Sequence, residues 1–232
     1  MITKSKRLLH LTVLLILLTF PLSAAASENV VVIDPGHGGS NMGVTLSKGL
    51  HEKNVTLIIA KLVKENLANT KNIKVRLTRF SDKVVSSAKR KRLAEKSDVD
   101  LFISLHVNAG FGLKAKGYEI YYPSVAVPLI KNNSSMEIVK NMEQNRCFNN
   151  SVRFAQIVRK NMGRVFPREG RGLRNAPVLV LESITTPAVL LEMGFATNLD
   201  NSPKLKDKKI QKAIADALAR SIKKYFSSDG TL

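Results

Sequence analysis

The feature of this 232-residue chain that most constrains its fold is a series of short apolar runs of strand length. These runs lie at 30–33, 73–77, 101–105, 118–122, 178–181 and 188–191. Helical patterns lie between several of them, and no repeat, Gly/Ser linker or low-complexity tract divides the chain. The sequence therefore predicts a single α/β domain, with a mainly parallel twisted sheet of about six strands flanked by helices.

Helices are predicted from runs in which apolar residues recur on one face. They are expected over 52–67, 86–95, 151–165 and 203–226. In the first of them, Val55, Ile59 and Leu62 share a face, and in the last the lysines fall largely opposite the apolar stripe. The stretch between the fourth strand segment and the third helix is polar, rich in asparagine and without a clear pattern.

Polar residues follow three of the strand segments. The first segment leads into Asp34 and His37, the third directly into His106, and the last directly into Glu192. In an open α/β sheet, chemistry gathers beyond the carboxyl ends of the strands, so these groups are expected to converge. Taken singly, a histidine at a strand end is more often a hydrogen-bonded structural residue, and Glu192 could simply pair with an arginine.

The combination of these residues favours a catalytic metal site. Outside the N-terminal segment the histidines are His37, His51 and His106, and two of these three stand at strand ends. Two imidazoles and one carboxylate are the ligand set of a catalytic zinc site, with a fourth position for water. Glu192 would then serve as general base. Glu52, which opens the first helix, has a simpler alternative, because a carboxylate suits the positive end of a helix dipole.

Eight segments of the chain follow one another in the order of a known enzyme family. They are VVIDPGHGG (31–39), GLHEKNVTL (49–57), VRLTRFSD (75–82), the helical segment 90–94, DLFISLHVNA (100–109), GYEIYYP (117–123), RGLRNAPVLVL (171–181) and PAVLLEMGFATN (187–198). In these segments the chain resembles the zinc-dependent N-acetylmuramoyl-L-alanine amidases. The resemblance implies hydrolysis of the amide between N-acetylmuramic acid and L-alanine, which releases stem peptides from peptidoglycan.

Position by position, the resemblance implies zinc ligands at His37, Glu52 and His106 and a catalytic glutamate at Glu192. His51 lies beside a ligand but matches no ligand position. One Zn²⁺ per chain is the implied cofactor, and peptidoglycan is the implied substrate. The chain departs from the family at 40–43, where many relatives have Asp-Pro-Gly. It also departs at Glu95, where asparagine is usual, and at Gly117, where a glycine pair is common. No departure removes a ligand.

Other functions stay open at this point. A zinc peptidase with the same scaffold would cut a different cell-wall amide, and an inactive wall-binding or activator domain would be expected to have degenerate ligand positions. Nucleic-acid binding has only the net charge of +19 in its favour, because no motif or aromatic platform accompanies that charge. We therefore expect no nucleic-acid partner.

The N-terminal segment 1–26 has the pattern of a secretion signal. Three basic residues precede an apolar run over 8–20, and small residues end at Ala26. Because that run is shorter than the ~20 residues of a membrane span, we expect cleavage and no lasting membrane anchor. The predicted catalytic domain is 27–232, exported to a periplasm rather than to a Gram-positive wall or the medium. The single Cys147 cannot form an internal disulfide.

Three further residues are candidate substrate contacts. Arg171 and Arg174 lie in one family segment, and a guanidinium group suits the carboxylates of a stem peptide. Asn108 lies in the segment of His106.

Residues 124–150 form an insertion that is longer than the minimal family pattern needs. In periplasmic relatives that a partner activates, an insertion here carries a helix that blocks the zinc cleft. The resemblance therefore suggests an autoinhibitory helix with Glu137 and Glu143, relieved by an activator protein; the alternative is a surface or substrate-contact loop.

Overall fold

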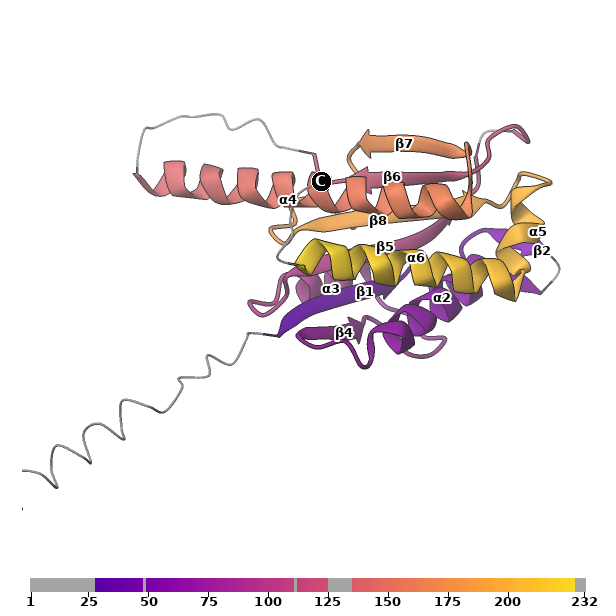
Figure 1. Cartoon of the computed structure of the whole chain (residues 1–232), viewed down its shortest axis with the longest axis horizontal. Helices are drawn as coiled ribbons and strands as arrows, with labels where there is room; N and C mark the ends of the chain where they lie inside the picture. The colour runs from indigo at the N-terminus through magenta and orange to yellow at the C-terminus, as the bar shows by residue number, and fades with distance from the viewer. Residues whose placement is uncertain (1–27, 48, 111, 125–134, 228–232) are drawn as a thin grey trace, which may run out of the picture.

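The computed structural model describes residues 28–47, 49–110, 112–124 and 135–227. At its centre is a six-stranded sheet with the order β4-β1-β5-β8-β6-β7 (Figure 1). The strands are β1 (Asn29–Pro35), β4 (Ile73–Leu77), β5 (Leu101–Asn108), β6 (Tyr118–Tyr122), β7 (Gly170–Asn175) and β8 (Ala188–Phe195). Neighbouring strands pair in parallel except β6 and β8, which are antiparallel. The predicted fold class is confirmed. The predicted secretion signal, 1–26, lies outside the described residues.

One predicted strand is wrong. Residues 178–181 do not form a strand but enter a series of turns, in which the backbone N–H of Leu181 donates to the carbonyl of Val178 at 2.8 Å. Leu181 does not lie in the sheet; it is buried because it belongs to the apolar cluster that includes Val32 and Phe102 of the neighbouring strands. The sixth strand is β7, whose sequence GRGLRN is mostly polar and largely exposed. It forms an edge strand through backbone pairing with β6, which an apolar pattern does not reveal.

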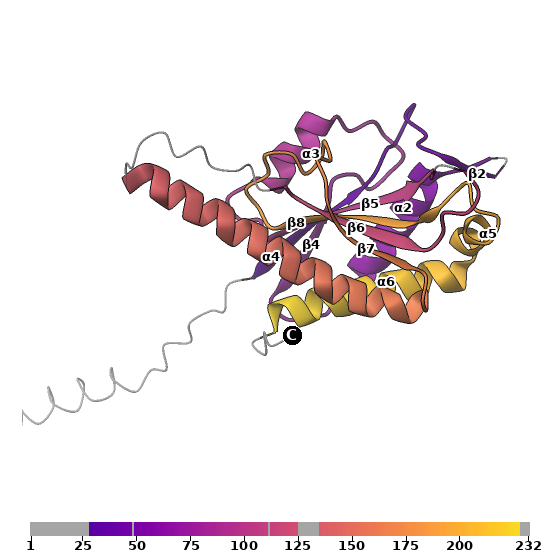
Figure 2. The same ribbon diagram turned by 90° about the horizontal axis from the view of Figure 1, so that it is seen from above.

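The helices are α2 (Glu52–Leu67), α3 (Ser87–Ala94), α4 (Ser135–Val165), α5 (Asn201–Lys206) and α6 (Lys208–Phe226). Helices α2, α4 and α6 cover one face of the sheet, and α3 lies on the other (Figures 1 and 2). The helix predicted over 203–226 is therefore divided in two. Asp207 leaves the helical conformation, with φ −71° and ψ 120°, and its side chain accepts from the backbone N–H of Lys209 at 2.7 Å, which caps α6.

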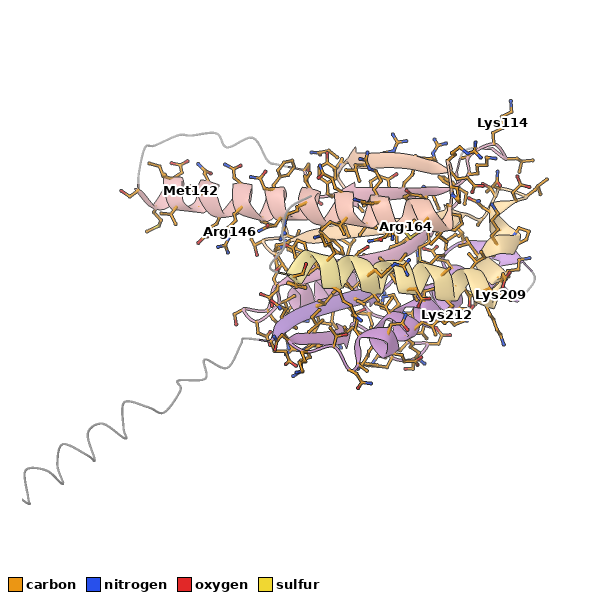
Figure 3. The ribbon with its side chains drawn as sticks, viewed as in Figure 1. Lys114, Met142, Arg146, Arg164, Lys209 and Lys212 are labelled. Carbon is orange, nitrogen blue, oxygen red and sulfur yellow. The ribbon has the colours of Figure 1, made fainter. Side chains whose placement is uncertain are left out.

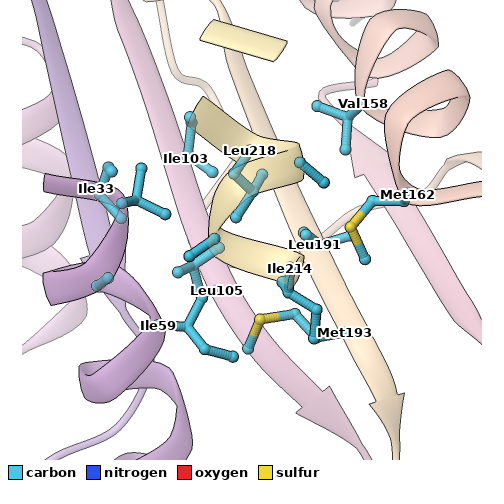
Figure 4. Packing of buried hydrophobic residues seen from close by; sticks show 14 of the residues in the cluster. Ile33, Ile59, Ile103, Leu105, Val158, Met162, Leu191, Met193, Ile214 and Leu218 are labelled. Carbon is cyan, nitrogen blue, oxygen red and sulfur yellow. The ribbon is translucent and has the colours of Figure 1, made fainter. Parts of the chain in front are cut away.

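Both faces of the sheet are buried, which explains the continuous apolar runs in its strands. Along β1, Val31 and Ile33 pack into the cluster that includes α2 and α6 residues, whereas Val30 and Val32 pack with Ala94 of α3. Figure 4 shows part of the larger cluster, in which side chains from α2, α4, α6 and the central strands pack together. The labelled residues are Ile33, Ile59, Ile103, Leu105, Val158, Met162, Leu191, Met193, Ile214 and Leu218.

Helix α4 begins well before the predicted 151–165, and its first part extends beyond the sheet (Figures 2 and 3). We call residues 135–146 the α4 arm. At the base of the arm, Cys147 is buried and Ser151 accepts from the backbone N–H of Ala188, the first residue of β8, at 2.9 Å. The arm therefore leaves the body at the amino end of β8. Among the described residues, no helix is both long enough and apolar enough to cross a membrane.

A small antiparallel pair, β2 (Thr45–Ser47) and β3 (Leu50–His51), precedes α2. The backbone N–H of Glu52 donates to the carbonyl of Val44 at 2.8 Å, which ties the start of α2 to this pair. The predicted helix 52–67 matches α2 in both bounds. Because Glu52 is its first residue, the position of its carboxylate depends on how this helix begins.

Candidate metal centre

Three side chains predicted as ligands meet at the carboxyl edge of the sheet. His37 lies in the loop after β1, Glu52 begins α2, and His106 lies near the end of β5. The Oε1 atom of Glu52 lies 3.0 Å from Nε2 of His37 and 2.9 Å from Nδ1 of His106. One potential ligand atom from each residue lies within 4.8 Å of the others. The fold thus brings together the cluster that the strand ends and the family segments suggested.

The loop over residues 36–43, which we call the metal loop, is held by a buried arginine from α3. His37 has a φ of 61°, a left-handed conformation that costs a non-glycine residue roughly 1–2 kcal/mol. Arg90 donates to the carbonyl of His37 at 2.6 Å and to that of Pro35 at 2.9 Å, and it pairs with the buried Asp34. These bonds fix the backbone of His37 in its strained conformation.

A second buried arginine joins the metal loop to α2. Arg79 is completely buried, and its Nη2 donates to the carbonyls of Gly36 at 2.9 Å and Lys53 at 2.8 Å. Gly36 precedes His37, and Lys53 follows Glu52. The guanidinium of Arg79 therefore links the backbone next to His37 with the backbone next to Glu52. Because the group is planar, rigid and buried, it holds these two segments at a fixed distance.

The ring of His37 is oriented by Asn41. The Oδ1 of Asn41 lies 2.8 Å from Nδ1 of His37. Since an amide oxygen only accepts, Nδ1 carries a proton and Nε2 faces Glu52. Asp34, which the sequence placed at the end of the first strand, does not contact the ring; its carboxylate accepts from the hydroxyls of Thr78 and Ser104. Asn41 stands in the segment where the chain departs from its family pattern.

Glu52 carries a stable negative charge between the two imidazoles. Its side chain is 2% exposed, and its oxygens also accept from the backbone N–H groups of Val107 at 2.9 Å and Val44 at 3.0 Å. Burial alone would raise the pKa of Glu52, but hydrogen bonds from His106 and His37 lower it to about 2. The hydrogen bond to Glu52 in turn raises the pKa of His37. An ionised carboxylate in this position favours a bound cation.

Glu192 lies beside this cluster with one oxygen unsatisfied. Its backbone pairs in register with His106, so both side chains leave neighbouring strands at the same level. The Oε2 of Glu192 is buried and has no hydrogen-bond partner among the described residues. Burial, followed by the charges of Glu52 and Glu119, raises the pKa of Glu192 to about 8. A buried polar atom without a partner is rare in proteins and is a frequent sign of a reactive group.

Glu119 is a site residue that the sequence patterns missed. It lies on β6 with 5% exposure, and its carboxylate accepts from Arg171 at 2.8 Å, Arg174 at 3.0 Å, Tyr121 at 3.0 Å and Asn108 at 3.3 Å. All three predicted substrate contacts are therefore gathered on one carboxylate. The available signal was an acidic residue within the apolar run 118–122, which is unusual for a buried strand.

The two acidic residues of the predicted autoinhibitory helix lie elsewhere. Glu137 and Glu143 are on the α4 arm, which extends beyond the sheet (Figure 2) and leaves the body at the amino end of β8. The metal cluster instead lies at the carboxyl ends of the parallel strands. In this arrangement neither carboxylate reaches the cluster. His51 also stays outside it, and its ring nitrogen Nδ1 lies 3.2 Å from the hydroxyl of Thr45.

The donor set fits a zinc ion. Two imidazole nitrogens and one ionised carboxylate converge, and a fourth, open position is the usual arrangement of catalytic zinc. The surrounding backbone is also close to the donors: a Cβ on Gly43 would lie 2.4 Å from Oε2 of Glu52 and 2.7 Å from the ring of His37. The clustered side chains of Glu52 and His37 therefore pack closely against the backbone of the metal loop.

Comparison with known proteins agrees with this geometry. A family model described as N-acetylmuramoyl-L-alanine amidase matches residues 31–224. The N-acetylmuramoyl-L-alanine amidase CwlM of Bacillus licheniformis is 32% identical over 199 residues, which cover 85% of this chain and 68% of CwlM.

Solved structures share the fold. The N-acetylmuramoyl-L-alanine amidase from Clostridium difficile 630 matches with a TM-score of 0.72 at 29% identity, over 87% of this chain and 98% of that one. The CwlD amidase from Clostridioides difficile, solved in complex with the GerS lipoprotein, matches with a TM-score of 0.69 at 24% identity, over 87% and 100% of the two chains. At that identity the second likeness concerns the fold alone.

Proposed function

This chain belongs to the N-acetylmuramoyl-L-alanine amidase family, and we propose that it hydrolyses the amide between N-acetylmuramic acid and L-alanine in peptidoglycan, with zinc as cofactor. The observation that carries the proposal is the cluster of His37, Glu52 and His106 beside the unsatisfied Oε2 of Glu192. An inactive wall-binding domain would have no need for this arrangement.

His37, Glu52 and His106 would hold the zinc ion through Nε2, a carboxylate oxygen and Nδ1. When bound, the metal would polarise the scissile carbonyl and increase the acidity of water. The chain's own contribution is to hold the imidazole of His37 and the metal loop in position. Asn41 does this for His37, and the buried arginines Arg79 and Arg90 do it for the backbone of the metal loop.

Glu192 would move the protons of the reaction. Water attacks the carbonyl carbon and forms the new C–O bond, while Oε2 of Glu192 accepts the proton that the water loses. The C–N bond then breaks, and the same oxygen returns this proton to the departing nitrogen of alanine. The positive charge of a nearby metal ion would oppose the raised pKa of Glu192 and favour its ionised, basic form.

Arg171, Arg174 and Asn108 are proposed to contact the substrate. The side chains of the two arginines are 41% and 44% exposed, so each guanidinium is accessible although one edge of it bonds Glu119. Guanidinium groups suit the carboxylates of a stem peptide. Asn108 follows His106 by two residues, at the end of the same strand.

Digestion of purified peptidoglycan, with and without a chelator, tests the proposed function. We expect mass spectrometry to find intact stem peptides and unbroken glycan chains, and we expect the chelator to abolish their release. A zinc peptidase with a different target would instead release truncated peptides. Release that continues after the metal has been removed would contradict the proposed cofactor.

Export and partner binding are further parts of the proposal. The pattern of residues 1–26 supports secretion, with the periplasm as the expected compartment, and N-terminal sequencing of the mature protein would test cleavage after Ala26. Four apolar side chains of the α4 arm are exposed, namely Met136, Ile138, Val139 and Met142. They support an activator-binding role for the insertion 124–150. If this insertion also restrains the enzyme, deleting 128–148 should raise basal hydrolysis.

A further inference from the structure

The spacing of Arg171 and Arg174 is unusual for two side chains that reach one group. They lie three residues apart on β7, and in a regular strand residues at odd spacing point to opposite faces of the sheet. Both nevertheless donate to the same oxygen, Oε1 of Glu119. The geometry of β7 must therefore depart from that of a regular strand between them.

A β-bulge accounts for this arrangement. Tyr118 and Ile120 of β6, two residues apart, pair with Gly170 and Leu173 of β7, three residues apart. The extra residue lies in the stretch that contains Gly172, whose φ of 93° is accessible to glycine but not to most other residues. The bulge brings Arg171 and Arg174 to the same face. Bulges of this kind often re-aim side chains next to active sites.

Glu119 occupies a costly position. It pairs directly opposite Glu192 in the antiparallel ladder of β6 and β8, which puts two carboxylates on the same face of neighbouring strands. Like charges in that position destabilise a sheet. A carboxylate placed there for stability alone would be better replaced by an apolar residue, so its contacts with Arg171 and Arg174 indicate a function.

The contacts of Glu119 leave donors available for a ligand. Arg171 bonds Glu119 through Nε alone, and Arg174 through Nη2 alone, so other N–H groups of both guanidiniums have no hydrogen-bond partner among the described residues. Glu119 neutralises one of the two positive charges. The three side chains together keep one net positive charge, fixed in place beside Glu192.

We propose that Glu119 is a positioning residue that converts Arg171 and Arg174 into one receptor for a substrate carboxylate next to the scissile amide. This inference rests on the proposed function, and it adds a specificity: the enzyme prefers stem peptides with a free carboxylate close to L-alanine over amidated ones. In the substrate, that group is a free carboxylate on the stem residue that follows L-alanine.

The test uses two preparations of peptidoglycan that differ only in whether this carboxylate is free or amidated. For the wild type with zinc, we expect kcat/KM to be roughly tenfold or more higher on the acidic substrate, as charge-assisted hydrogen bonds would give. Glu119→Gln should bring this ratio close to one, chiefly through a higher KM on the acidic substrate. The double variant Arg171→Gln/Arg174→Gln should lower the ratio in the same way.

The sign of the change separates positioning from simple charge attraction. Glu119→Gln raises the local charge by one unit, so if the arginines acted only by general attraction, the preference for the acidic substrate would increase. An unchanged or increased ratio would overturn the inference. Adding Glu119→Gln to the double arginine variant should have no further effect on the ratio, because Glu119 acts through the two arginines.

Controls keep the test independent of folding and of the proposed function. Zinc content should stay near wild type in Glu119→Gln. Because Glu119 also raises the pKa of Glu192, the variant should change the activity on both substrates, and the ratio of the two activities corrects for that common change. If that variant does not fold, Tyr121→Phe removes one bond to Glu119 and should lower the ratio by a smaller factor; an unchanged ratio there would count against positioning. Failure of the proposed function would differ, because wild-type protein with zinc would release stem peptides from neither preparation.

Discussion

The metal loop and the α4 arm differ both in regular structure and in how firmly the rest of the protein holds them. The metal loop has no regular structure beyond an isolated bridge between Gly38 and Asn41, yet buried Arg79 and Arg90 bond its carbonyl groups. The α4 arm is helical throughout, yet Met136 and Met142 on it are 84% and 65% exposed. Tight placement of a segment therefore does not require regular secondary structure, and a regular helix need not be tightly placed.

The difference shows that buried hydrogen-bond partners can hold a segment in place even where it has no helical or strand geometry. Each guanidinium under the metal loop gives several donors to carbonyls that would otherwise be buried without a partner. The arm gains its backbone hydrogen bonds but buries little apolar surface, so it is expected to open at low cost. Changes to the two regions should therefore differ greatly in effect.

The largest effect is expected from the proposed ligands. His37→Ala or His106→Ala should reduce bound zinc to the background level and abolish peptidoglycan hydrolysis, because two donors do not hold the metal in a catalytic geometry. His51→Ala, adjacent to Glu52 but outside the cluster, is the matched control and should keep both properties. Metal analysis and a dye-release assay measure them. Normal zinc content in either ligand variant would contradict the assignment.

The next largest effect concerns Glu192. Glu192→Gln should lower kcat by about 10²–10⁴-fold while zinc stays bound, because the amide cannot accept and return a proton. Glu182→Gln, an exposed glutamate outside the cluster, should leave hydrolysis unchanged. Nearly normal turnover by the Glu192 variant would remove the general-base role and leave only a structural explanation for its buried carboxylate.

The support beneath the metal loop should be almost as sensitive. Arg90→Ala leaves the buried carboxylate of Asp34 without its ionic partner, and breaking such a pair costs about 3–5 kcal/mol. Arg92→Ala, on the same helix but exposed, should change the free energy of unfolding by less than about 0.5 kcal/mol. Urea unfolding gives both values. Equal, small changes would mean that the loop does not depend on Arg90.

Sequence patterns predicted the sheet and the clustered side chains because both depend on signals that are local in the chain. Apolar runs mark β1, β5 and β8 since these strands are buried on both faces, and their ends carry His37, His106 and Glu192. The structure brings the expected groups together, while their roles as ligands and base stay predictions.

The parts that could not be predicted depend on contacts between distant segments. Strand β7 is polar and, among the described strands, pairs only with β6, so no periodicity reveals it. The contacts of Glu119 depend on a bulge in β7 and on pairing with β8, and neither is encoded near residue 119. The division between α5 and α6 at Asp207 was missed because the apolar spacing continues across it.

The free energy of unfolding should depend on pH because of the buried Glu192 beside the metal cluster. Burial raises the pKa of Glu192 from its ordinary value of 4.5 to about 8 in the metal-free protein. Between these values the unfolded chain releases the proton and the folded chain keeps it, so stability should fall as pH rises from about 4.5 to 8 and level off above that. Relative to Glu192→Gln, we expect a loss of a few kcal/mol.

The measurement is urea unfolding of metal-free wild type and Glu192→Gln at pH 5, 6.5 and 8. Because Glu52 and His37 titrate in both proteins, the difference between the two curves isolates Glu192. Curves that stay parallel across this window would mean that Glu192 ionises in the folded protein as it does in the unfolded chain.

The smallest effect on stability is expected from a substitution on the α4 arm. Helix α4 also supplies the buried residue with which the exposed one is compared. Met142 is 65% exposed on the arm, whereas Met162, twenty residues later on α4, is fully buried against the sheet. Met142→Ala should change the free energy of unfolding by less than about 0.5 kcal/mol, while Met162→Ala should cost about 2–5 kcal/mol through lost burial and a cavity. Met142→Ala should also leave basal hydrolysis unchanged. A large loss of stability from Met142→Ala would mean that the arm is packed against the protein, and its apolar side chains would then no longer support partner binding.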